Sequence, residues 1–314
     1  MRLLTFNWHE SYLHLLASIG HDWDVVLRRK GGRTDWWREV RPMPETMTIV
    51  SEEEALARAA RGVYDAVMCH NLLDLGLVVD LGTPTCTIFH TSRDLEVAFG
   101  LDVASFDRVG RPLLEKTTIV FVSPLKQASW DLPGTVILPG VDLADYGGYT
   151  GEVARILHVG NLKRELSSVN GMPMLESAAA SLPFTLLGMN PTIPGSKLSA
   201  DWDDSRAHFR SHRVYLHTTT PPFEDGYNLA MLEAMATGMP VVALAHQTCP
   251  VTNGVDGFTG DDVQALRLAL LELLEDADRA REIGAQGRNT VARLFPIERF
   301  RARWSELLAS VCPS

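Results

Sequence analysis

Short apolar runs alternate with amphipathic helical patterns along most of the chain. The strands of a parallel sheet are buried on both faces and are joined by helices, so this alternation predicts βα units and an α/β fold. Strands are expected at Arg2–Phe6, Asp24–Leu27, Tyr64–Cys69, Thr85–Phe89, Thr118–Val122, Thr135–Leu138, Arg155–Val159, Phe184–Leu187, Val214–Leu216 and Pro240–Leu244.

A glycine-rich stretch, residues 139–148, divides these strands into two series. It has neither a strand nor a helix period, which favours a hinge. The 314 residues exceed the size at which one hydrophobic core usually stops growing. We therefore expect two domains, residues 1–147 and 148–294. Helices are expected in the last third of the chain, over residues 261–274, 277–294 and 297 to about 308.

Ligands of open α/β sheets bind beyond the carboxyl ends of the strands, so residues directly after each strand are candidate site residues. These segments are rich in polar groups, which indicates a site, although loops are generally polar as well. They comprise residues 7–10, 70–71, 90–93, 123, 160–164, 188–190, 217–220 and 245–248.

Two acids, Asp225 and Glu233, flank a predicted helix start. A carboxylate near a first turn is suited to sugar hydroxyls, while the free amides of that turn face a diphosphate. Eight helical residues span about 12 Å with an angular offset of about 80°, which places both acids broadly on one side. The alternative is an amphipathic helix whose acids are favoured by the helix dipole.

Composition restricts the class of protein. Hydrophobic residues make up 46% and charged residues 22%, as in ordinary globular domains, and no apolar run is long enough to span a membrane. Residues 1–6 are too short for a signal peptide, so a cytoplasmic location is expected. The net charge of −10 argues against binding nucleic acid. Basic residues cluster at positions 28–30 and 299–303. We interpret these clusters as solvated surface, and the alternative is peripheral docking on anionic lipid.

Four cysteines stand far apart in the sequence, at Cys69, Cys86, Cys249 and Cys312. Their spacing fits neither a zinc site nor a disulfide framework, so buried free thiols are expected. No other cluster of residues has metal-ligand spacing, and no metal or cofactor is expected.

The run Tyr215–Val242, which contains both acids, resembles the core signature of family 4 retaining glycosyltransferases with the GT-B fold. Leu138–Asp142, Asp256–Gly260 and Phe295–Leu308 resemble the interdomain segment, the turn after the nucleotide site and the closing helix of that family. The resemblance implies two Rossmann-like domains facing a central cleft, with residues 295–314 packing back toward the N-terminal domain. It also implies metal-independent transfer of a hexose from a UDP- or GDP-linked sugar, with retention of configuration.

The same resemblance implies roles for individual residues. Asp225 would contact hydroxyls of the donor sugar and Glu233 the ribose. The family usually has Glu at the first position, so it stays open whether Glu224 or Asp225 reaches the sugar. His90 resembles a histidine beside the donor sugar, where it can donate to a hydroxyl or share positive charge with the reacting centre. The alternative for His90 is a histidine that only caps a strand.

A diphosphate needs positive charge. Where the family usually carries an Arg after the glycine of the first C-domain strand, this chain has Asn161. Lys163 and Arg164 are the expected replacement, although adjacent bases on a loop are often only solvated. Other expected donor contacts are Thr219, Gly226, Tyr227, Asn228 and Gln247, with Tyr227 and Asn228 placed in the first helical turn.

Acceptor contacts are expected from Trp8, His9 and Glu10, although His9 and Glu10 equally suit the start of a helix over residues 11–19. Trp36 and Trp37 follow Gly31-Gly32 in a loop, where they would stack on a sugar or lipid or serve as a packing lid. The acceptor itself, whether a sugar, a lipid-linked compound or a small molecule, stays open. The competing hypotheses are a nucleotide-sugar-binding protein without turnover and a sugar-nucleotide epimerase on a similar fold.

Overall fold

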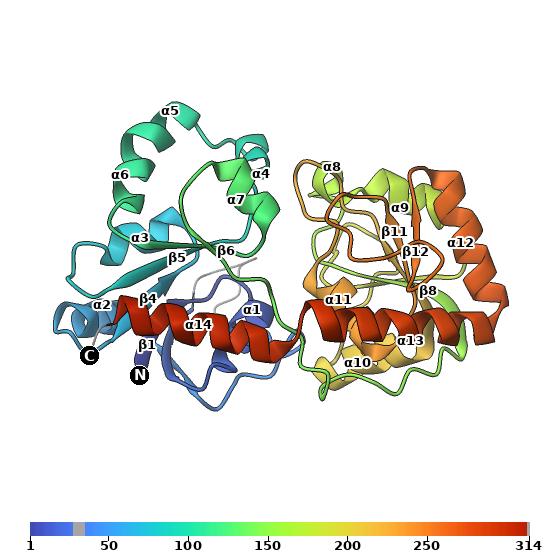
Figure 1. Cartoon of the computed structure of the whole chain (residues 1–314), viewed down its shortest axis with the longest axis horizontal. Coiled ribbons are helices and arrows are strands. Elements are labelled where there is room, and N and C mark those ends of the chain that lie inside the picture. Colours follow the sequence, from blue (N-terminus) through green and yellow to red (C-terminus); the bar gives the residue numbers. More distant parts are fainter. Residues whose placement is uncertain (28–34, 313–314) are drawn as a thin grey trace. The chain divides into compact units, whose positions relative to one another are not determined.

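The computed structural model describes residues 1–27 and 35–312 of the chain. The predicted Arg28–Lys30 cluster and Gly31-Gly32 lie outside the described residues. Contacts divide the chain into two compact units. Unit 1 comprises Met1–Gly140 and Glu298–Ser314, and unit 2 comprises Val141–Ile297. Each unit holds one parallel sheet, which confirms the predicted pair of parallel-sheet α/β domains (Figure 1).

The sheet of unit 1 has the strand order β3-β2-β1-β4-β5-β6-β7. Its strands are β1 (Arg2–Phe6), β2 (Asp22–Val26), β3 (Met47–Val50), β4 (Ala66–Cys69), β5 (Thr85–Phe89), β6 (Thr118–Phe121) and β7 (Thr135–Val136). Its helices are α1 (Glu10–Ala17), α2 (Glu52–Ala60), α3 (Leu72–Val78), α4 (Arg93–Ala98), α5 (Val103–Ser105), the π-helix η1 (Phe106–Gly110), α6 (Arg111–Leu114), α7 (Pro124–Trp130) and α14 (Ile297–Val311), the last beginning in unit 2.

The sheet of unit 2 has the strand order β12-β11-β10-β8-β9. Its strands are β8 (Val153–Val159), β9 (Phe184–Leu187), β10 (His212–His217), β11 (Val241–Leu244) and β12 (Phe258–Gly260). Its helices are α8 (Ser167–Asn170), α9 (Met172–Ala178), α10 (Trp202–Ser211), α11 (Leu229–Thr237), α12 (Val263–Glu275) and α13 (Ala277–Leu294).

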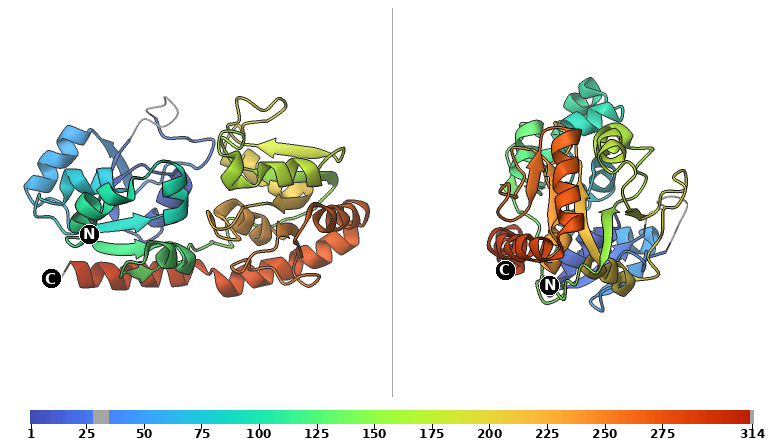
Figure 2. Two further views of the ribbon diagram at one scale, coloured as in Figure 1. Left: turned by 90° about the horizontal axis from the view of Figure 1, so that it is seen from above. Right: turned by 90° about the vertical axis from the view of Figure 1, so that its right-hand side faces the viewer.

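Helices cover both faces of the unit 2 sheet (Figure 2). On one face, α9 and α12 pack on Ile156, Val214 and Val242 of three neighbouring strands in one apolar cluster. Helices α10, α11 and α13 also contact the sheet; α11 packs on both α10 and α13, and α13 in addition meets α12. Because apolar side chains are needed on both faces, the strands are continuous apolar runs, which is the pattern that made them predictable.

Small polar caps fix where helices begin after the strands of unit 1. Ser51, Asn71, Ser92 and Ser123 each accept a hydrogen bond from the backbone N–H three residues on. Such a cap satisfies an N–H that the helix itself cannot pair. The caps at Asn71 and Ser92 keep the loops after β4 and β5 short, and so hold the intervening residues at the sheet edge.

Each sheet has one point where the direction of strand addition reverses. In unit 1 the chain adds β2 and β3 on one side of β1 and then returns to place β4 on the other side. In unit 2 it adds β9 on one side of β8 and then β10 on the other. Ligands of open α/β sheets bind at such points, beyond the carboxyl ends of the strands. The β1/β4 and β8/β10 edges are therefore the places to look for a site.

Most predicted strands and helices match the observed elements, with β1, β5, β9 and α13 at the predicted bounds. Strands β3 and β12 were not predicted, because both are short edge strands in which only some residues are buried. Trp36 and Trp37 are buried, at 4% and 5% exposure, so the interpretation of these indoles as exposed stacking surfaces is wrong.

Two further expectations concern buried free thiols and membrane-spanning segments. All four cysteines are free, but only Cys69 and Cys86 are buried, whereas Cys249 and Cys312 are half-buried. Within residues 1–27 and 35–312, no helix combines the length and the apolar character needed to cross a bilayer.

Close packing of α13 against the turn between α11 and β11 depends on a glycine. A Cβ added at Gly284 would lie 1.9 Å from the carbonyl oxygen of Gly238, a backbone atom that cannot move freely. Gly284→Ala is therefore expected to lower the free energy of unfolding by about 1–3 kcal/mol in chemical denaturation. Gly76→Ala in α3 is the matched control, because its Cβ meets nothing within 4 Å. That control is expected to be neutral or stabilising, and an equal loss in both variants would contradict the packing argument.

Candidate functional site

Lys163 lies in the loop after β8, at the β8/β10 edge of unit 2. Its side chain folds back over Gly160, where an added Cβ would lie 2.8 Å from Lys163 Cδ. Lys163 is only 4% exposed, and its burial lowers the pKa of the ammonium from 10.5 to about 8, while the charge of Glu224 acts in the opposite direction. A desolvated ammonium at a strand end is a strong point of attraction for an anion.

His217 ends the neighbouring strand β10, and its tautomer follows from its hydrogen bonds. The Thr219 hydroxyl donates to the carbonyl oxygen of Asp225 at 2.8 Å, so it accepts from His217 Nε2–H, also at 2.8 Å. Burial, followed by the charge of Lys163, lowers the pKa of His217 to about 3. His217 is thus neutral, and it anchors the loop that carries Asp225.

His158, in β8, adds a second neutral imidazole near the same lysine. Its Nδ1–H donates to the carbonyl oxygen of Leu216 at 2.7 Å. Burial is the main cause that holds the pKa of His158 well below its usual value, and the charge of Lys163 is the next. Because His158 and His217 both stay neutral, the positive charge of this cluster resides on Lys163.

Glu224 and Asp225 are adjacent in sequence but face different neighbours. The charge of Glu224 acts on Lys163. The charge of Asp225 instead acts on His246 and Tyr227, and it is the second cause, after burial, that raises the pKa of Tyr227. Asp225 is 2% exposed, whereas Glu224 is half-buried. The two acids thus occupy different parts of the unit 2 edge.

Helix α11 begins later than the sequence pattern suggested. Asn228 is its N-cap, with the side chain accepting from Met231 N at 2.9 Å, so the helix starts at Leu229 and the placement of Tyr227 and Asn228 in its first turn is wrong. Asp225 precedes the helix, so the argument from helical phase does not apply to it. Glu233 lies within α11 and is 7% exposed. The loop, and not helix geometry, therefore sets the position of Asp225.

The remaining predicted donor contacts are spread around this edge. Gly226 N–H donates to Thr248 Oγ1 at 2.7 Å, so that amide is already used within the protein. Tyr227 packs on Phe295, with ring centroids 5.1 Å apart. Gln247 is exposed. Arg164 is exposed and pairs with Glu176 at 3.3 Å, so the structure separates it from the buried Lys163.

At the β1/β4 edge of unit 1, three side chains form a hydrogen-bonded chain. Thr5 Oγ1 lies 2.9 Å from His70 Nε2, and His70 Nδ1 lies 2.8 Å from His90 Nε2. Burial lowers the pKa of His70 to about 3, whereas His90 is half-buried at the sheet edge. His90 is therefore not an isolated strand cap but the outer member of a buried polar chain.

Among the predicted acceptor residues, Trp8 contacts His90. Trp8 is 36% exposed and stacks on His90, with centroids 6.2 Å apart and planes 18° from parallel. His9 is the N-cap residue of α1 and makes no side-chain capping bond. Glu10 is 2% exposed and accepts from Asn7 Nδ2 at 2.9 Å, at the start of α1. Trp8 is therefore the predicted acceptor residue that lies beside the histidine with an exposed ring.

The sequence placed His70 and His217 among the polar residues that directly follow predicted strands, but it indicated no particular role for either. Thr5 and His158 were not predicted as site residues, because both lie inside apolar strand runs.

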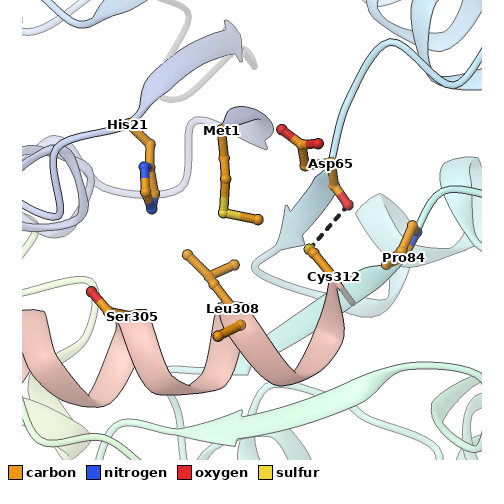
Figure 3. Close-up of a pocket in the computed structure, with 8 residues that line it drawn as sticks. Met1, His21, Asp65, Pro84, Ser305, Leu308 and Cys312 are labelled. Carbon is orange, nitrogen blue, oxygen red and sulfur yellow. Dashed lines mark hydrogen bonds between the residues drawn. The ribbon is translucent and has the colours of Figure 1, made fainter. Parts of the chain in front are cut away.

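A separate hollow of about 640 Å³ lies in unit 1 (Figure 3). It is lined by Met1, His21, Asp65, Pro84, Ser305, Leu308, Ala309 and Cys312. Four of these residues directly precede strands β1, β2, β4 and β5, so the hollow is at the amino ends of the strands. The Cys312 thiol donates to the carbonyl oxygen of Asp65 at 3.2 Å. Ligands of this fold class bind at the opposite edge, so the hollow is not part of the candidate site.

Among the side chains that the structure describes, no group of three or more His, Cys, Asp or Glu residues is arranged to hold a metal ion. The candidate site consists instead of a buried cation, two buried acids and neutral imidazoles. Such a set is suited to bind a polar, negatively charged ligand that carries hydroxyl groups.

Residues 156–276 match a sequence model of the family described as group 1 glycosyl transferases. The matched segment lies within unit 2 and contains Lys163, Glu224, Asp225 and Glu233. A comparison with curated protein sequences gives no match.

Solved structures resemble the whole chain. Anabaena Alr3699/HepE in complex with UDP and glucose is 17% identical with a TM-score of 0.76, over 99% of this chain and 100% of that one. Sucrose-phosphate synthase from Thermosynechococcus elongatus is 16% identical with a TM-score of 0.73, over 99% and 98% of the two chains. A glycosyltransferase from Rickettsia africae is 13% identical with a TM-score of 0.67, over 100% and 99%.

At these identities the structural likeness establishes the fold. Two parallel-sheet α/β domains match GT-B glycosyltransferase structures, as the sequence predicted. Together with the family match in unit 2, the fold supports a GT-B glycosyltransferase.

Proposed function

We propose that the protein is a retaining hexosyltransferase that uses a nucleoside diphosphate sugar and needs no metal. The observation that carries the proposal is the buried Lys163 at the β8/β10 edge, in the same unit as the buried acids Asp225 and Glu233. A diphosphate supplies the charge that compensates the ammonium, and the sugar and ribose supply hydroxyls for the acids. The acceptor is a sugar, a lipid-linked compound or a small molecule.

Few groups of the protein take part in the proposed reaction. Lys163 and the N-terminal end of α11 stabilise the diphosphate as the bond between it and the sugar breaks. The acceptor oxygen bonds to the anomeric carbon on the same face, and its proton passes to the departing diphosphate oxygen. Glu233 binds the ribose, Asp225 orients the sugar, and His90 acts beside the reacting carbon.

The choice of donor is open to direct measurement. The structure of Alr3699/HepE was obtained with UDP and with UDP-glucose, which makes UDP-glucose the first donor to test, followed by GDP-linked sugars. Release of nucleoside diphosphate, even slowly into water, supports a transferase. Tight binding without turnover favours the binding protein, and a changed sugar without diphosphate release favours the epimerase.

Two further measurements test the finer claims. NMR of the product reports the anomeric configuration, and inversion would contradict the proposed mechanism. Excess chelator should leave the rate unchanged if no metal takes part, and loss of activity that added Mg²⁺ restores would contradict that part of the proposal.

Substitution of each adjacent acid separates their roles. Asp225→Asn is expected to lower turnover by about 10- to 150-fold, because a buried charge-assisted hydrogen bond contributes about 1.5–3 kcal/mol. Glu224→Gln is the matched control for loss of one carboxylate from the same loop. We expect a smaller loss from it, since Glu224 is half-buried and its charge acts on Lys163. Steady-state kinetics with the preferred donor provide the comparison, and the reverse order of effects would assign the sugar contact to Glu224.

A further inference from the structure

The hydrogen-bonded chain of Thr5, His70 and His90 has a defined direction. The Thr5 hydroxyl donates to the carbonyl oxygen of Met68 at 3.3 Å. A hydroxyl carries one proton, so with that proton directed to Met68 the Thr5 oxygen, 2.9 Å from His70 Nε2, is the acceptor, and His70 then carries its proton on Nε2.

The tautomer of His70 then determines that of His90. With its proton on Nε2, neutral His70 offers Nδ1 as a lone pair, which lies 2.8 Å from His90 Nε2. His90 must donate into that lone pair, so its Nε2 carries a proton. The hydrogen bond at one ring nitrogen thus sets the state of the other, as is usual for functional histidines.

The surroundings keep His70 neutral and both rings in place. His70 is 4% exposed, and burial lowers the pKa of its imidazole to about 3. Tyr12 packs edge-on against both rings, with centroids 6.2 Å from His70 and 4.6 Å from His90. The backbone N–H of His70 is bound by the carboxylate of Asp74 at 3.3 Å. Together with the contact between Thr5 and Nε2, these contacts hold His70 at its backbone N–H, at its ring and at Nε2.

We propose that His70, oriented by Thr5, is a positioning residue that holds His90 in the Nε2–H tautomer and presents His90 Nδ1 to the donor sugar. The part that concerns the sugar rests on the proposed function. Neutral His90 accepts a hydrogen bond from a sugar hydroxyl through Nδ1, and protonated His90 donates one from the same atom. The Nε2–H bond to His70 is kept in both states, so His90 keeps one orientation.

The tautomers can be measured without any turnover. Histidine labelled with ¹⁵N distinguishes protonated from unprotonated ring nitrogens by NMR, and pH 8.5 lies well above the ordinary histidine pKa of about 6.5. In the wild type we expect His90 and His70 each to carry a proton on Nε2. Thr5→Val keeps the β-branched shape and removes the acceptor for His70. In that variant His70 is expected to move its proton to Nδ1, and His90 is then expected to carry its proton on Nδ1.

Kinetics test whether the relay acts through His90. Thr5→Val and His70→Leu are expected to lower kcat by about 10-fold, as loss of an orienting partner commonly does, with little change in donor KM. His70→Asn is the matched variant, because its amide oxygen replaces Nδ1 as an acceptor and should restore part of kcat. In a His90→Ala background none of these substitutions should lower kcat further.

The outcomes separate the relay from the proposed function. A wild-type His90 with its proton on Nδ1, a Thr5→Val variant with unchanged tautomers, or a kcat loss that persists in the His90→Ala background would each overturn the relay. If the wild type shows no turnover with any nucleotide sugar, the proposed function fails, and the NMR result alone decides whether His70 sets the tautomer of His90.

Discussion

Glu233→Gln is expected to weaken binding of the donor nucleotide by about 10- to 150-fold. The residue lies in α11, where residues from Met231 to Thr237 are buried, and it is itself only 7% exposed. A charged acceptor that binds ribose hydroxyls in such a place contributes about 1.5–3 kcal/mol, and each 1.4 kcal/mol is one factor of ten in affinity. Isothermal titration calorimetry with UDP and with GDP measures the loss and identifies the preferred base.

A control for this substitution is available in the same unit. Glu275→Gln removes a carboxylate at the end of α12, where the side chain is exposed, and it should leave the affinity unchanged. Circular dichroism should show that both variants are folded. Unchanged affinity of a folded Glu233→Gln variant would rule out the ribose contact.

Lys163→Met is expected to have opposite effects on binding and on stability. Loss of the ammonium should weaken donor binding by at least about 10-fold, because a charge-assisted bond to the diphosphate is removed. The same change should stabilise the ligand-free protein at pH 7. Burial makes the protonated lysine unfavourable in the folded state, and methionine fills similar space without a charge.

The lowered pKa of Lys163 determines how stability and donor binding change with pH. The pKa of Lys163 is about 8 in the folded protein and 10.5 for an unperturbed lysine. Between these values the unfolded chain binds more protons than the folded one, so this residue makes stability rise with pH from about 8 to 10.5. Below about pH 8 the penalty is fully present. Donor affinity of the wild type should fall over the same range, as the lysine of the free protein becomes neutral.

Denaturation and calorimetry at pH 7 and pH 9.5 measure both effects. In Lys163→Met the part of each pH dependence that comes from this lysine should disappear. Lys197→Met is the matched control, since Lys197 is exposed. Equal donor affinity of Lys163→Met and wild type at pH 7 would show that the diphosphate binds elsewhere.

The parallel sheets could be predicted because each depends on a local pattern. Strands such as Thr85–Phe89 are buried along their whole length and read as apolar runs in the sequence. Edge strands such as Met47–Val50 bury only some residues, so their pattern is too weak to separate from loops. The start of α11 was misplaced because Asn228, and not an earlier residue, supplies the capping oxygen, which a sequence rich in polar residues does not reveal.

The candidate site was predictable only where residues lie near one another in sequence. Glu224, Asp225 and Glu233 fall in one motif, but the neighbours of Lys163 come from strands β8 and β10 and from the loop before α11, and tertiary structure brings them together. The same holds for Thr5, His70 and His90, which are brought together by the order β1-β4-β5 in the sheet. The sequence also made Lys163 and Arg164 look equivalent, and only burial distinguishes them.

Unit 2 is formed by one continuous segment of the chain and unit 1 by two separate segments, and this difference affects folding during synthesis. Unit 1 needs α14, whose Phe300, Trp304 and Leu308 are buried. Phe300 meets Tyr12 of α1 edge-on, with centroids 6.2 Å apart. The ribosome releases residues 1–140 first, but their apolar face stays uncovered until the last helix emerges. Unit 2 can therefore complete its core before unit 1, although it is translated later.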